Sequence, residues 1–374
     1  LYLIKNELKR NDLLRHYMFN LVQKHETLIL ALNNEPMRKI IVPLFLAISL
    51  VGCKTQMKDV TKVDPNQFSK TITSSELSDY LYTFSSDDFQ GRDTGEPGQK
   101  KAAEYLKDYY KSLNIQGGSF EEEDSYFQTI PSAYFNDKFK ASENVISIIK
   151  GSELPEEYLV ITSHYDHIGM KDGEIYNGAD DDGSGTVAIM EIAEAFQKAV
   201  SEGYRPKRSI IFLHVTAEEK GLLGSKYYSE NPIYPLENTV ANLNIDMIGR
   251  IDEAHQDDPN YVYLIGSDKL STDLHEISEK ANATYTDLNL DYTYNDENDP
   301  NRFYYRSDHY NFAKFDIPII FYFNGVHEDY HQPTDTPEKI EYDLLEKRAR
   351  LVFFTAWEIA NRDERPFVDK PTLQ

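Results

Sequence analysis

Apolar runs of strand length alternate with helical patterns along most of this 374-residue chain. The apolar runs cover residues 144–149, 158–163, 209–215, 239–245, 261–265 and 317–323. The helical patterns cover residues 186–199, 220–229, 273–282, 308–315 and 342–361, with two more within 76–113. Strands that alternate with helices form a mostly parallel sheet that is covered on both faces. The pattern therefore predicts an α/β fold, a three-layer sandwich with a mostly parallel central sheet and helices on both faces.

Side chains that can bind metal ions follow four of these apolar runs. His164 follows the run LVITS, Glu218 follows IIFLHVTA, Asp246 follows ANLNI, and His331 comes a short loop after IIFYF. Open α/β sheets bind their ligands beyond the carboxyl ends of the strands. We therefore expect these side chains to meet at one edge of the sheet. This convergence, more than any single motif, predicts a functional site.

The motif SHYDHIG carries His164 and Asp166 two positions apart. On an extended backbone such residues point to the same side, so one can bind a metal ion while the other holds its ring. An isolated pair of this kind is more often a histidine that is simply paired with an aspartate at the end of a strand.

The motif GADDDGSG places Asp180, Asp181 and Asp182 directly before a predicted helix. A helix start favours a capping aspartate, but three adjacent acids repel one another and pack poorly without a cation. A tight, glycine-rich turn can also present one carboxylate to two cations. For this motif the pattern favours a metal site over a helix cap.

The remaining motifs are ambiguous when each is taken alone. Glu218 and Glu219 in TAEEKG can supply one general base and one metal ligand, but a solvated acidic triplet at a helix start is the commoner case. Asp246 precedes Met-Ile-Gly, where it can equally be a cap or turn residue. For His331, in the loop DYHQPTDT, the alternative is an ordinary exposed histidine.

The stretch from His327 to His331 also matches the pattern H-E-x-x-H of zinc proteases. That pattern works only on a helix, where the two histidines lie one turn apart. Asn324-Gly325 precedes the stretch, and Pro333 and Pro337 follow it. Because the residue before a proline is pushed away from helical geometry, we expect no helix here and interpret the match as accidental.

Taken in order, the motifs HxD, DDDGSG, EE, NxDM and YHxxxDT resemble those of the co-catalytic di-zinc aminopeptidase family. That family includes secreted bacterial leucine-type aminopeptidases, glutamate carboxypeptidase and the glutaminyl cyclases. The resemblance extends over roughly residues 76–361 and implies two zinc ions per chain. It assigns His164 and Asp246 to one ion and Glu219 and His331 to the other, with Asp181 as the bridge.

The resemblance also implies three catalytic roles. Glu218 would be the general base, Asp166 would support His164 and the metal, and Tyr330 would stabilise an oxyanion. Two ions that share one water lower its pKa and polarise the scissile carbonyl, and Glu218 would pass the proton of that water to the leaving amine. The expected activity is that of a zinc-dependent exopeptidase, an aminopeptidase that hydrolyses N-terminal residues of peptides.

Three other functions are alternatives to this activity. Glutaminyl cyclases use one zinc ion, and they typically lack ligands of the His164 and Asp246 type. Carboxypeptidase-like amidohydrolases with an inserted dimerisation domain lack the DDDGSG form. A non-catalytic, peptide-binding envelope lipoprotein would have substituted ligand or base positions, and none is substituted here. Aminopeptidase as opposed to carboxypeptidase or dipeptidase action is implied by the resemblance alone.

The N-terminal region resembles the export signal of a bacterial lipoprotein. Met37-Arg38-Lys39 opens a basic segment, residues 40–51 are apolar, and Leu50-Val51-Gly52-Cys53 resembles a lipobox. Cys53 is the only cysteine, so an intramolecular disulfide is excluded. We expect a spurious extension over 1–36, a signal peptide over 37–52, a tether over 53–72 and a single di-zinc peptidase domain over 73–374. Lipidation of Cys53 would anchor the protein in the bacterial envelope, facing the periplasm or the cell exterior.

A formal net charge of −24 argues against nucleic acid or an anionic membrane surface as a partner. Peptides are the expected substrates. The loop 287–306 is rich in Asp, Asn and Tyr and is a candidate rim of the site. Its tyrosines are candidates for shaping the pocket for the substrate side chain: Tyr292, Tyr294, Tyr304 and Tyr305.

Overall fold

The computed structural model describes residues 57–120 and 125–370, which belong to one compact unit. The extension predicted at 1–36, the signal peptide predicted at 37–52 and Cys53 lie outside the described residues. None of the helices in the described ranges is both long enough and apolar enough to cross a lipid bilayer.

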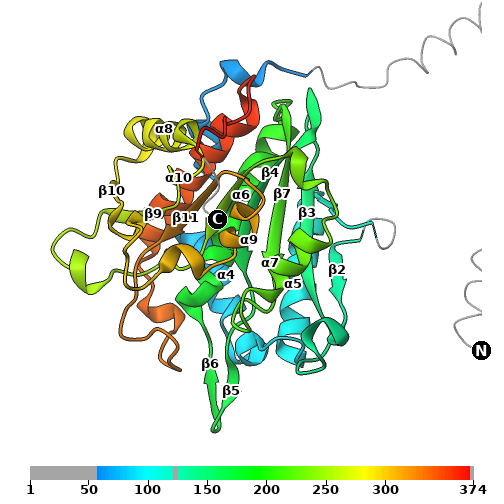
Figure 1. The fold of residues 1–374 in the computed structure, drawn as a ribbon, viewed down its shortest axis with the longest axis vertical. Helices are drawn as coiled ribbons and strands as arrows, with labels where there is room; N and C mark the ends of the chain where they lie inside the picture. The colour runs from blue at the N-terminus through cyan, green and yellow to red at the C-terminus, as the bar shows by residue number, and fades with distance from the viewer. Residues whose placement is uncertain (1–56, 121–124, 371–374) are drawn as a thin grey trace, which may run out of the picture. The chain divides into compact units, whose positions relative to one another are not determined.

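Four parallel strands form the centre of a nine-stranded sheet (Figure 1). In spatial order they are β7 (Arg208–Val215), β4 (Leu154–His164), β8 (Thr239–Ile245) and β11 (Ile319–Phe323). These are the strands whose carboxyl ends carry the predicted metal-binding motifs. The convergence predicted from the sequence therefore rests on four neighbouring parallel strands.

The strands at both flanks of the sheet run antiparallel to this centre. β3 (Ser142–Ile149) pairs with β7 in antiparallel fashion, and β1 (Gln116–Gly117) and β2 (Phe127–Ile130) pair with β3. On the other flank β9 (Tyr261–Ile265) is antiparallel to β11, and β10 (Asn289–Asp291) is parallel to β9. The predicted three-layer α/β fold is confirmed, and its sheet is mixed because only the centre is fully parallel.

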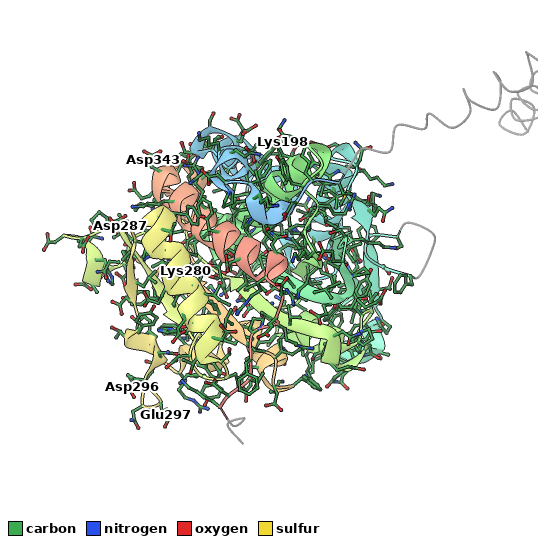
Figure 2. All side chains as sticks on the ribbon, turned by 90° about the horizontal axis from the view of Figure 1, so that it is seen from above. Lys198, Lys280, Asp287, Asp296, Glu297 and Asp343 are labelled. Atoms are coloured by element: carbon green, nitrogen blue, oxygen red, sulfur yellow. The ribbon has the colours of Figure 1, made fainter. Side chains whose placement is uncertain are left out.

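Helices cover both faces of the sheet because its strands are apolar on both sides. In β4, Leu159 and Ile161 belong to one core and Val160 belongs to the other, as the alternation of side chains along a strand requires. One core is covered by α4 (Ser74–Phe84), α5 (Pro97–Ser112), α6 (Gly185–Ser201), α8 (Thr272–Ala281) and α10 (Tyr342–Asn361). The other is covered by α7 (Leu223–Glu230) and α9 (His309–Ala313). Figure 2 shows α8 and α10 side by side, with charged residues such as Lys280 and Asp343 on the outside.

The six strands and seven helices predicted from the sequence are all present, and the last helix has the predicted bounds, 342–361. The short strands β1, β2 and β10 were not predicted, nor was the hairpin of β5 (Gly169–Lys171) and β6 (Glu174–Tyr176). Strands of two to four residues carry too few side chains to show a periodic pattern.

Packing begins before residue 73, where the tether was predicted to end. A short helical turn covers Val60–Lys62, and α3 covers Asn66–Ser69. Val60, Phe68 and Ile72 are all buried in the core that α4, α5, α6, α8 and α10 cover. The prediction of a flexible tether is therefore wrong for residues 60–72, because their apolar side chains pack against the domain.

A buried carboxyl group lies among the helices on this side of the sheet. Glu191 of α6 is fully buried, and its Oε2 accepts a hydrogen bond from the main-chain N–H of Thr73 at 3.2 Å. Its Oε1 has no hydrogen-bond partner. Burial, with the nearby charges of Glu76, Glu194 and Glu346, raises the pKa of Glu191 to about 9. The folded protein therefore holds Glu191 in its neutral form near pH 7.

This buried acid predicts a pH-dependent stability difference in the variant Glu191→Gln. In the unfolded chain the carboxyl ionises above its ordinary pKa of 4.5, whereas in the folded chain it stays protonated up to about pH 9. Wild-type stability therefore falls through this window by up to about 1.4 kcal/mol per pH unit. We expect Glu191→Gln to lack this loss, so that its thermal midpoint exceeds that of the wild type increasingly from pH 5 to pH 9. The exposed substitution Glu358→Gln on α10 should track the wild type, and parallel pH profiles for all three proteins would contradict the prediction.

Candidate metal centre

The five predicted metal ligands come together at the carboxyl edge of the central strands. His164 is the last residue of β4, and Asp246 directly follows β8. Glu219 lies in the loop after β7, and His331 lies in a turn after β11. Asp181 belongs to the irregular helical turn Ala179–Ser184 that precedes α6. One loop from each central strand thus contributes to a single cluster, together with the start of α6.

The first group of ligands surrounds the imidazole of His164. Its Nε2 lies 3.1 Å from Oδ1 of Asp181 and 3.6 Å from Oδ1 of Asp246. Its Nδ1 donates a hydrogen bond to the main-chain carbonyl of Asp166 at 3.0 Å. That bond fixes the orientation of the ring, so that Nε2 faces the two carboxylates. Burial alone would lower the pKa of His164, but the nearby carboxylates, those of Glu218 and Asp246 above all, raise it well above its usual range. A metal ion at Nε2 would therefore replace a proton.

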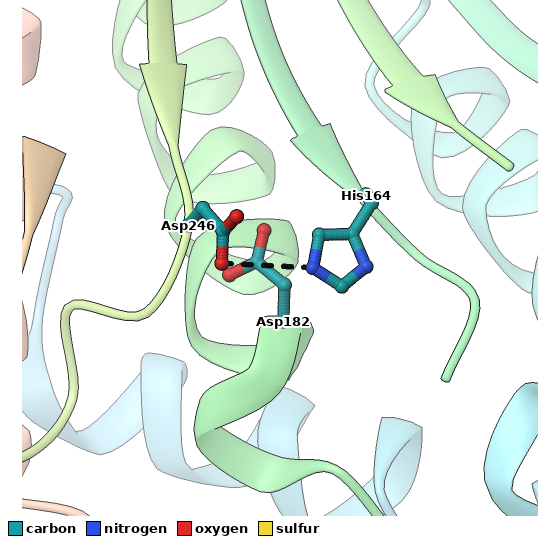
Figure 3. Close-up of side chains that lie close together, drawn as sticks. All are labelled: His164, Asp182 and Asp246. Atoms are coloured by element: carbon teal, nitrogen blue, oxygen red, sulfur yellow. Dashed lines mark ion pairs between the residues drawn. The ribbon is translucent and has the colours of Figure 1, made fainter. Parts of the chain in front are cut away.

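Asp182 also reaches this first group (Figure 3). Its Oδ1 accepts hydrogen bonds from the main-chain N–H groups of Gly185 at 2.9 Å and Met247 at 3.1 Å. Burial and the charge of Asp246 raise the pKa of Asp182 well above its usual range. Asp182 therefore joins the start of α6 to the loop after β8, which keeps Asp246 facing His164.

The second group of ligands lies on the other side of Asp181. Nε2 of His331 lies 3.0 Å from Oδ2 of Asp181 and 3.3 Å from Oε1 of Glu219. Oδ1 of the same Asp181 faces His164. The two oxygens of one carboxylate thus serve different groups, which is the arrangement that a bridging ligand needs.

His167 joins the second group, although it is not among the predicted ligands. Its Nδ1 lies 2.9 Å from Oε1 of Glu219 and 3.7 Å from Oδ2 of Asp181. The side chain is fully buried. The signal that was missed is the second histidine of SHYDHIG, which lies three residues after His164.

The three residues with predicted catalytic roles border the same cluster. Asp166 contacts His164 through its main-chain carbonyl, while its carboxylate lies farther away, at 3.9 Å from Nδ1. That carboxylate instead accepts a hydrogen bond from the main-chain N–H of Glu218 at 3.1 Å. The ring of Tyr330 stacks on the ring of His331, with 3.9 Å between centroids. Asp166 thus fixes the loop of Glu218 as well as His164.

Electrostatics within the cluster favour bound positive charge. Burial alone would lower the pKa of His331, but the carboxylates of Asp181 and Glu219 raise it to about 10. Burial and Asp181 alone would raise the pKa of Glu219, but His167 and His331 lower it to about 2. For Glu218, desolvation and the nearby charge of Asp246 raise the pKa well above its usual range. The histidine protons neutralise carboxylates that a metal ion would otherwise neutralise.

The donor set fits zinc ions. Several buried polar atoms of the cluster have no hydrogen-bond partner: Oδ2 of Asp181, Oδ2 of Asp182, Oε1 of Glu219 and both ring nitrogens of His167. Unpartnered buried polar atoms are costly and call for a ligand, water or ion. Imidazole nitrogens and carboxylate oxygens are ligands that zinc prefers. The cluster can therefore hold metal ions at two positions that share Asp181.

The accidental H-E-x-x-H match does not form a zincin site. The residues from His327 to His331 lie outside any helix, in an irregular segment that ends in a turn. Nε2 of His327 lies 3.1 Å from Oδ2 of Asp180, whereas His331 faces Asp181 and Glu219. The prediction that this stretch forms no helix is confirmed.

Two buried charged residues hold the loops that carry the ligands. The carboxylate of Asp335 accepts hydrogen bonds from the main-chain N–H groups of Asp180, at 3.0 Å, and Asp181, at 3.1 Å. The guanidinium of Arg92 donates to the carbonyls of Tyr165 at 2.8 Å and Gly178 at 2.8 Å. It also donates to the carbonyls of Asn177 and Phe84. Arg92 thus joins the loop of His164 to the loop of Asp181.

A cavity of about 580 Å³ opens beside Tyr330. It is lined by Asp252, Glu253, Ala254, Tyr294, Asn301, Phe303, Arg306, Val326 and Tyr330. The predicted rim loop 287–306 contributes four residues to this wall, and Tyr294 is the only one of the candidate tyrosines among them. Tyr304 and Tyr305 line a neighbouring cavity of about 250 Å³, while the hydroxyl of Tyr292 donates to Glu279 of α8.

Comparison with known proteins places these residues in a family context. The model of a family described as Peptidase family M28 matches residues 144–356. Aminopeptidase YwaD of Bacillus subtilis is 28% identical over 243 residues, which are 63% of this chain and 48% of that protein. Probable glutamate carboxypeptidase LAMP1 of Arabidopsis thaliana is 39% identical over 105 residues, which are 28% of this chain and 14% of that protein. The chain thus spans half or less of these relatives.

Solved structures share the fold at low sequence identity. The LapA aminopeptidase of Legionella pneumophila has a TM-score of 0.62 at 23% identity and covers 80% of this chain and 75% of its own. BSAP, a zinc aminopeptidase of Bacillus subtilis, has a TM-score of 0.60 at 17% identity, with coverages of 78% and 96%. A glutaminyl cyclase of Bacteroides thetaiotaomicron has a TM-score of 0.56 at 17% identity, with coverages of 76% and 98%.

The contacts of Arg92 predict that the variant Arg92→Lys binds zinc more weakly. The planar guanidinium donates hydrogen bonds to four carbonyls, whereas a lysine ammonium has only three N–H donors and cannot reach all four. We expect zinc affinity to fall by about 10–100-fold, the usual range for groups that hold metal ligands in place. Competition with a chromophoric chelator measures it. Arg350→Lys is the matched control, because Arg350 also donates to carbonyls, those of Ser69 and Ile72, remote from the cluster. Unchanged zinc affinity in Arg92→Lys would refute this role.

Proposed function

The chain belongs to peptidase family M28, and we propose that it is a zinc-dependent aminopeptidase that removes N-terminal residues from peptides. The observation that carries this proposal is the position of Asp181. Its Oδ1 lies 3.1 Å from Nε2 of His164, and its Oδ2 lies 3.0 Å from Nε2 of His331. A single carboxylate that faces two histidines from opposite oxygens fits a pair of metal ions.

The proposed ligands of the two zinc ions are those that the sequence motifs suggest. His164 and Asp246 would hold one ion, Glu219 and His331 would hold the other, and Asp181 would contact both. When bound, such a pair supplies Lewis acidity that polarises a carbonyl group and makes a water nucleophilic near neutral pH. The chain's own side chains supply the proton transfer and the positioning of the substrate.

Glu218 is the proposed general base. It lies in the loop between β7 and α7, next to the ligand Glu219, and its main-chain N–H is fixed by Asp166 at 3.1 Å. Desolvation raises the pKa of its carboxyl, and a raised pKa makes a carboxylate a better proton acceptor near neutral pH. In the proposed reaction Glu218 accepts a proton from water and delivers it to the leaving amine.

The cavity beside Tyr330 is the proposed pocket for the N-terminal side chain. Tyr294, Phe303 and Tyr330 present aromatic surface to it. Two acidic residues, Asp252 and Glu253, and one basic residue, Arg306, also line it. Aromatic walls favour apolar side chains, since burial of apolar surface stabilises binding. We therefore propose that the enzyme prefers large apolar N-terminal residues.

Glutaminyl cyclase activity is less well supported. Cyclases of the resembled family use one zinc ion and typically lack ligands of the His164 and Asp246 type. Both residues are present here, and His164 Nε2 lies 3.6 Å from Asp246 Oδ1. The first group thus has both of the residues that cyclases typically lack, which favours a two-metal hydrolase.

Metal content and substrate choice together test the proposed function. Elemental analysis of the zinc-loaded domain should give two zinc ions per chain. Peptides with a free N-terminal leucine or phenylalanine should be cleaved, while the same peptides with an acetylated N-terminus should not. One zinc ion together with pyroglutamate formation from N-terminal glutamine would support the cyclase instead. Absence of bound zinc after reconstitution would leave a peptide-binding protein.

The role of Glu218 predicts a separation of activity from metal binding. The variant Glu218→Gln should lose about 10²–10⁴-fold in kcat, because the amide cannot accept the proton. Its zinc content should equal that of the wild type, because Glu218 is not among the proposed ligands. The exposed substitution Glu276→Gln on α8 should leave both quantities unchanged. Wild-type turnover by Glu218→Gln would overturn the assignment.

The position of Tyr330 predicts a smaller effect. Burial and the charges of Asp181 and Asp246 raise the pKa of the Tyr330 hydroxyl, so it stays protonated and can donate a hydrogen bond to a developing oxyanion. Tyr330→Phe should lower kcat by about 10-fold or more and leave KM nearly unchanged. A change confined to KM would indicate a packing role for the ring.

The lipobox-like sequence supports a location in the bacterial envelope. We propose that Cys53 is lipidated after removal of a signal peptide and anchors the enzyme so that it faces the periplasm or the cell exterior. Metabolic labelling with a radioactive fatty acid should mark the wild-type protein. The variant Cys53→Ala should be unlabelled, and labelling of that variant would contradict the proposal.

A further inference from the structure

His167 is a buried histidine for which the proposed catalytic roles have no use. It lies in SHYDHIG directly after Asp166, and its main-chain N–H donates to the carbonyl of Arg92 at 3.3 Å. Its side chain is fully buried. Neither ring nitrogen forms a hydrogen bond of good geometry, although Nδ1 lies 2.9 Å from Oε1 of Glu219. A buried imidazole in this state is unfavourable unless a further ligand satisfies it.

Other buried histidines of the described residues are better satisfied. His214 contacts the hydroxyl of Tyr110 at 2.6 Å and that of Ser163 at 3.1 Å, so both of its nitrogens are used. His309 contacts the carbonyl of Tyr304 at 2.8 Å through Nε2. His167 therefore differs from the histidines that fill the core, and a purely structural role leaves its ring nitrogens unexplained.

The position of Nδ1 supplies the explanation. It lies 2.9 Å from Oε1 of Glu219 and 3.7 Å from Oδ2 of Asp181, the oxygens that also face Nε2 of His331. His167, Asp181 and Glu219 each offer one atom to a group compact enough to hold a metal ion. The rings of His167 and His331 approach this group edge to face, with 5.9 Å between centroids.

The backbone fixes the ring in this position. A Cβ atom placed on Gly178 would lie 2.5 Å from Cγ of the His167 ring and 2.6 Å from Cδ2. The absence of a side chain at Gly178, which has φ of +53°, therefore leaves room for the imidazole. Gly178 also accepts the hydrogen bond from Arg92. The imidazole is thus confined between the loop of Asp181 and the carboxylate of Glu219.

We propose that His167 is a fourth protein ligand of the second metal position, through Nδ1. This inference rests on the proposed function only in requiring that metal binds at the cluster. The second position then has two imidazoles and two carboxylates, from His167, His331, Asp181 and Glu219. The first position has three proposed ligands, His164, Asp246 and Asp181. The nearby Asp182 also reaches it, but Oδ1 of Asp182 accepts hydrogen bonds from two main-chain N–H groups. Four protein ligands are typical of closed, structural zinc sites, whereas three leave a coordination position for water or substrate.

The proposal makes the two metal positions unequal. The second position holds its ion more tightly, because an additional preformed ligand contributes to it. The first position keeps an open coordination site and exchanges its ion more readily. His164 and Asp246 would then hold the ion with the more accessible coordination position, while His167 and His331 would hold the ion that fixes Asp181 and Glu219.

A crystal structure of the zinc-loaded wild-type domain tests the proposal directly. Nδ1 of His167 should lie about 2.0–2.1 Å from the zinc ion that His331 also binds. A separation of more than about 3 Å, with both ions present, would overturn the proposal and leave the proposed function intact. Absence of zinc from the cluster would instead contradict the proposed function, so the two failures are distinguishable.

Chelator titration of the zinc-loaded protein gives an independent readout. With increasing dipicolinate, the wild type should release its two zinc ions at well-separated concentrations. In His167→Gln the tighter ion should leave at a concentration at least about 10-fold lower. His275→Gln, at a partly exposed position on α8, is the matched control and should release zinc as the wild type does.

Thermal unfolding separates ligation from packing. Binding of zinc to the folded state alone raises the thermal midpoint. If His167 is a ligand, His167→Gln should unfold near the wild-type temperature without metal and gain less on zinc addition. A lower midpoint without metal, together with an unchanged gain on zinc addition, would identify His167 as a packing residue and overturn the proposal.

Discussion

Repulsion between buried carboxylates is the constraint on which the rest of this structure depends. Asp181, Asp182, Glu219 and Asp246 lie at one sheet edge, within reach of the same histidines. Such a cluster is stable only if positive charge compensates it. In the absence of metal the histidines provide that charge as protons, which is why the pKa of His331 reaches about 10. Metal binding must displace these protons, so it competes with them.

The surrounding structure resists this repulsion mainly through the backbone. Asp182 and Asp335 accept hydrogen bonds from main-chain N–H groups, and Arg92 donates hydrogen bonds to main-chain carbonyls. Main-chain partners hold the loops in place without adding further ionisable side chains to the cluster. The arrangement explains how three consecutive aspartates can be buried together at the start of α6. The three carboxylates have different partners, since Asp180 contacts His327, Asp181 lies between the ligand groups, and Asp182 ties two loops.

The sequence was sufficient for the centre of the fold and for the clustering of the five predicted ligands. Strand-length apolar runs followed by acidic or histidine motifs predicted that four strands would share one edge, and the order β7, β4, β8, β11 explains why the motifs meet. The antiparallel direction of β3 and β9 was not predictable, because an apolar strand has the same pattern in both directions. Arg92 and Asp335 were not predictable as supports for the site, because hydrogen bonds to main-chain groups leave no side-chain partner to recognise in the sequence. The second histidine of SHYDHIG is evident in the sequence. Only the conformation of the loop after β4, however, shows that the side chain of His167 faces Glu219.

The proposed ligands lie far apart along the chain, from His164 at the end of β4 to His331 after the last strand. Arg92 lies farther upstream still and closes on carbonyls at Tyr165 and Gly178. During synthesis the metal pocket therefore remains incomplete until β11 has been made and inserted beside β8. Long-range contacts of this kind are slow to form, because the loop between the partners loses entropy when it closes. Zinc capture would then mark the end of folding, so that a truncated chain lacking His331 would lose one of the proposed ligands.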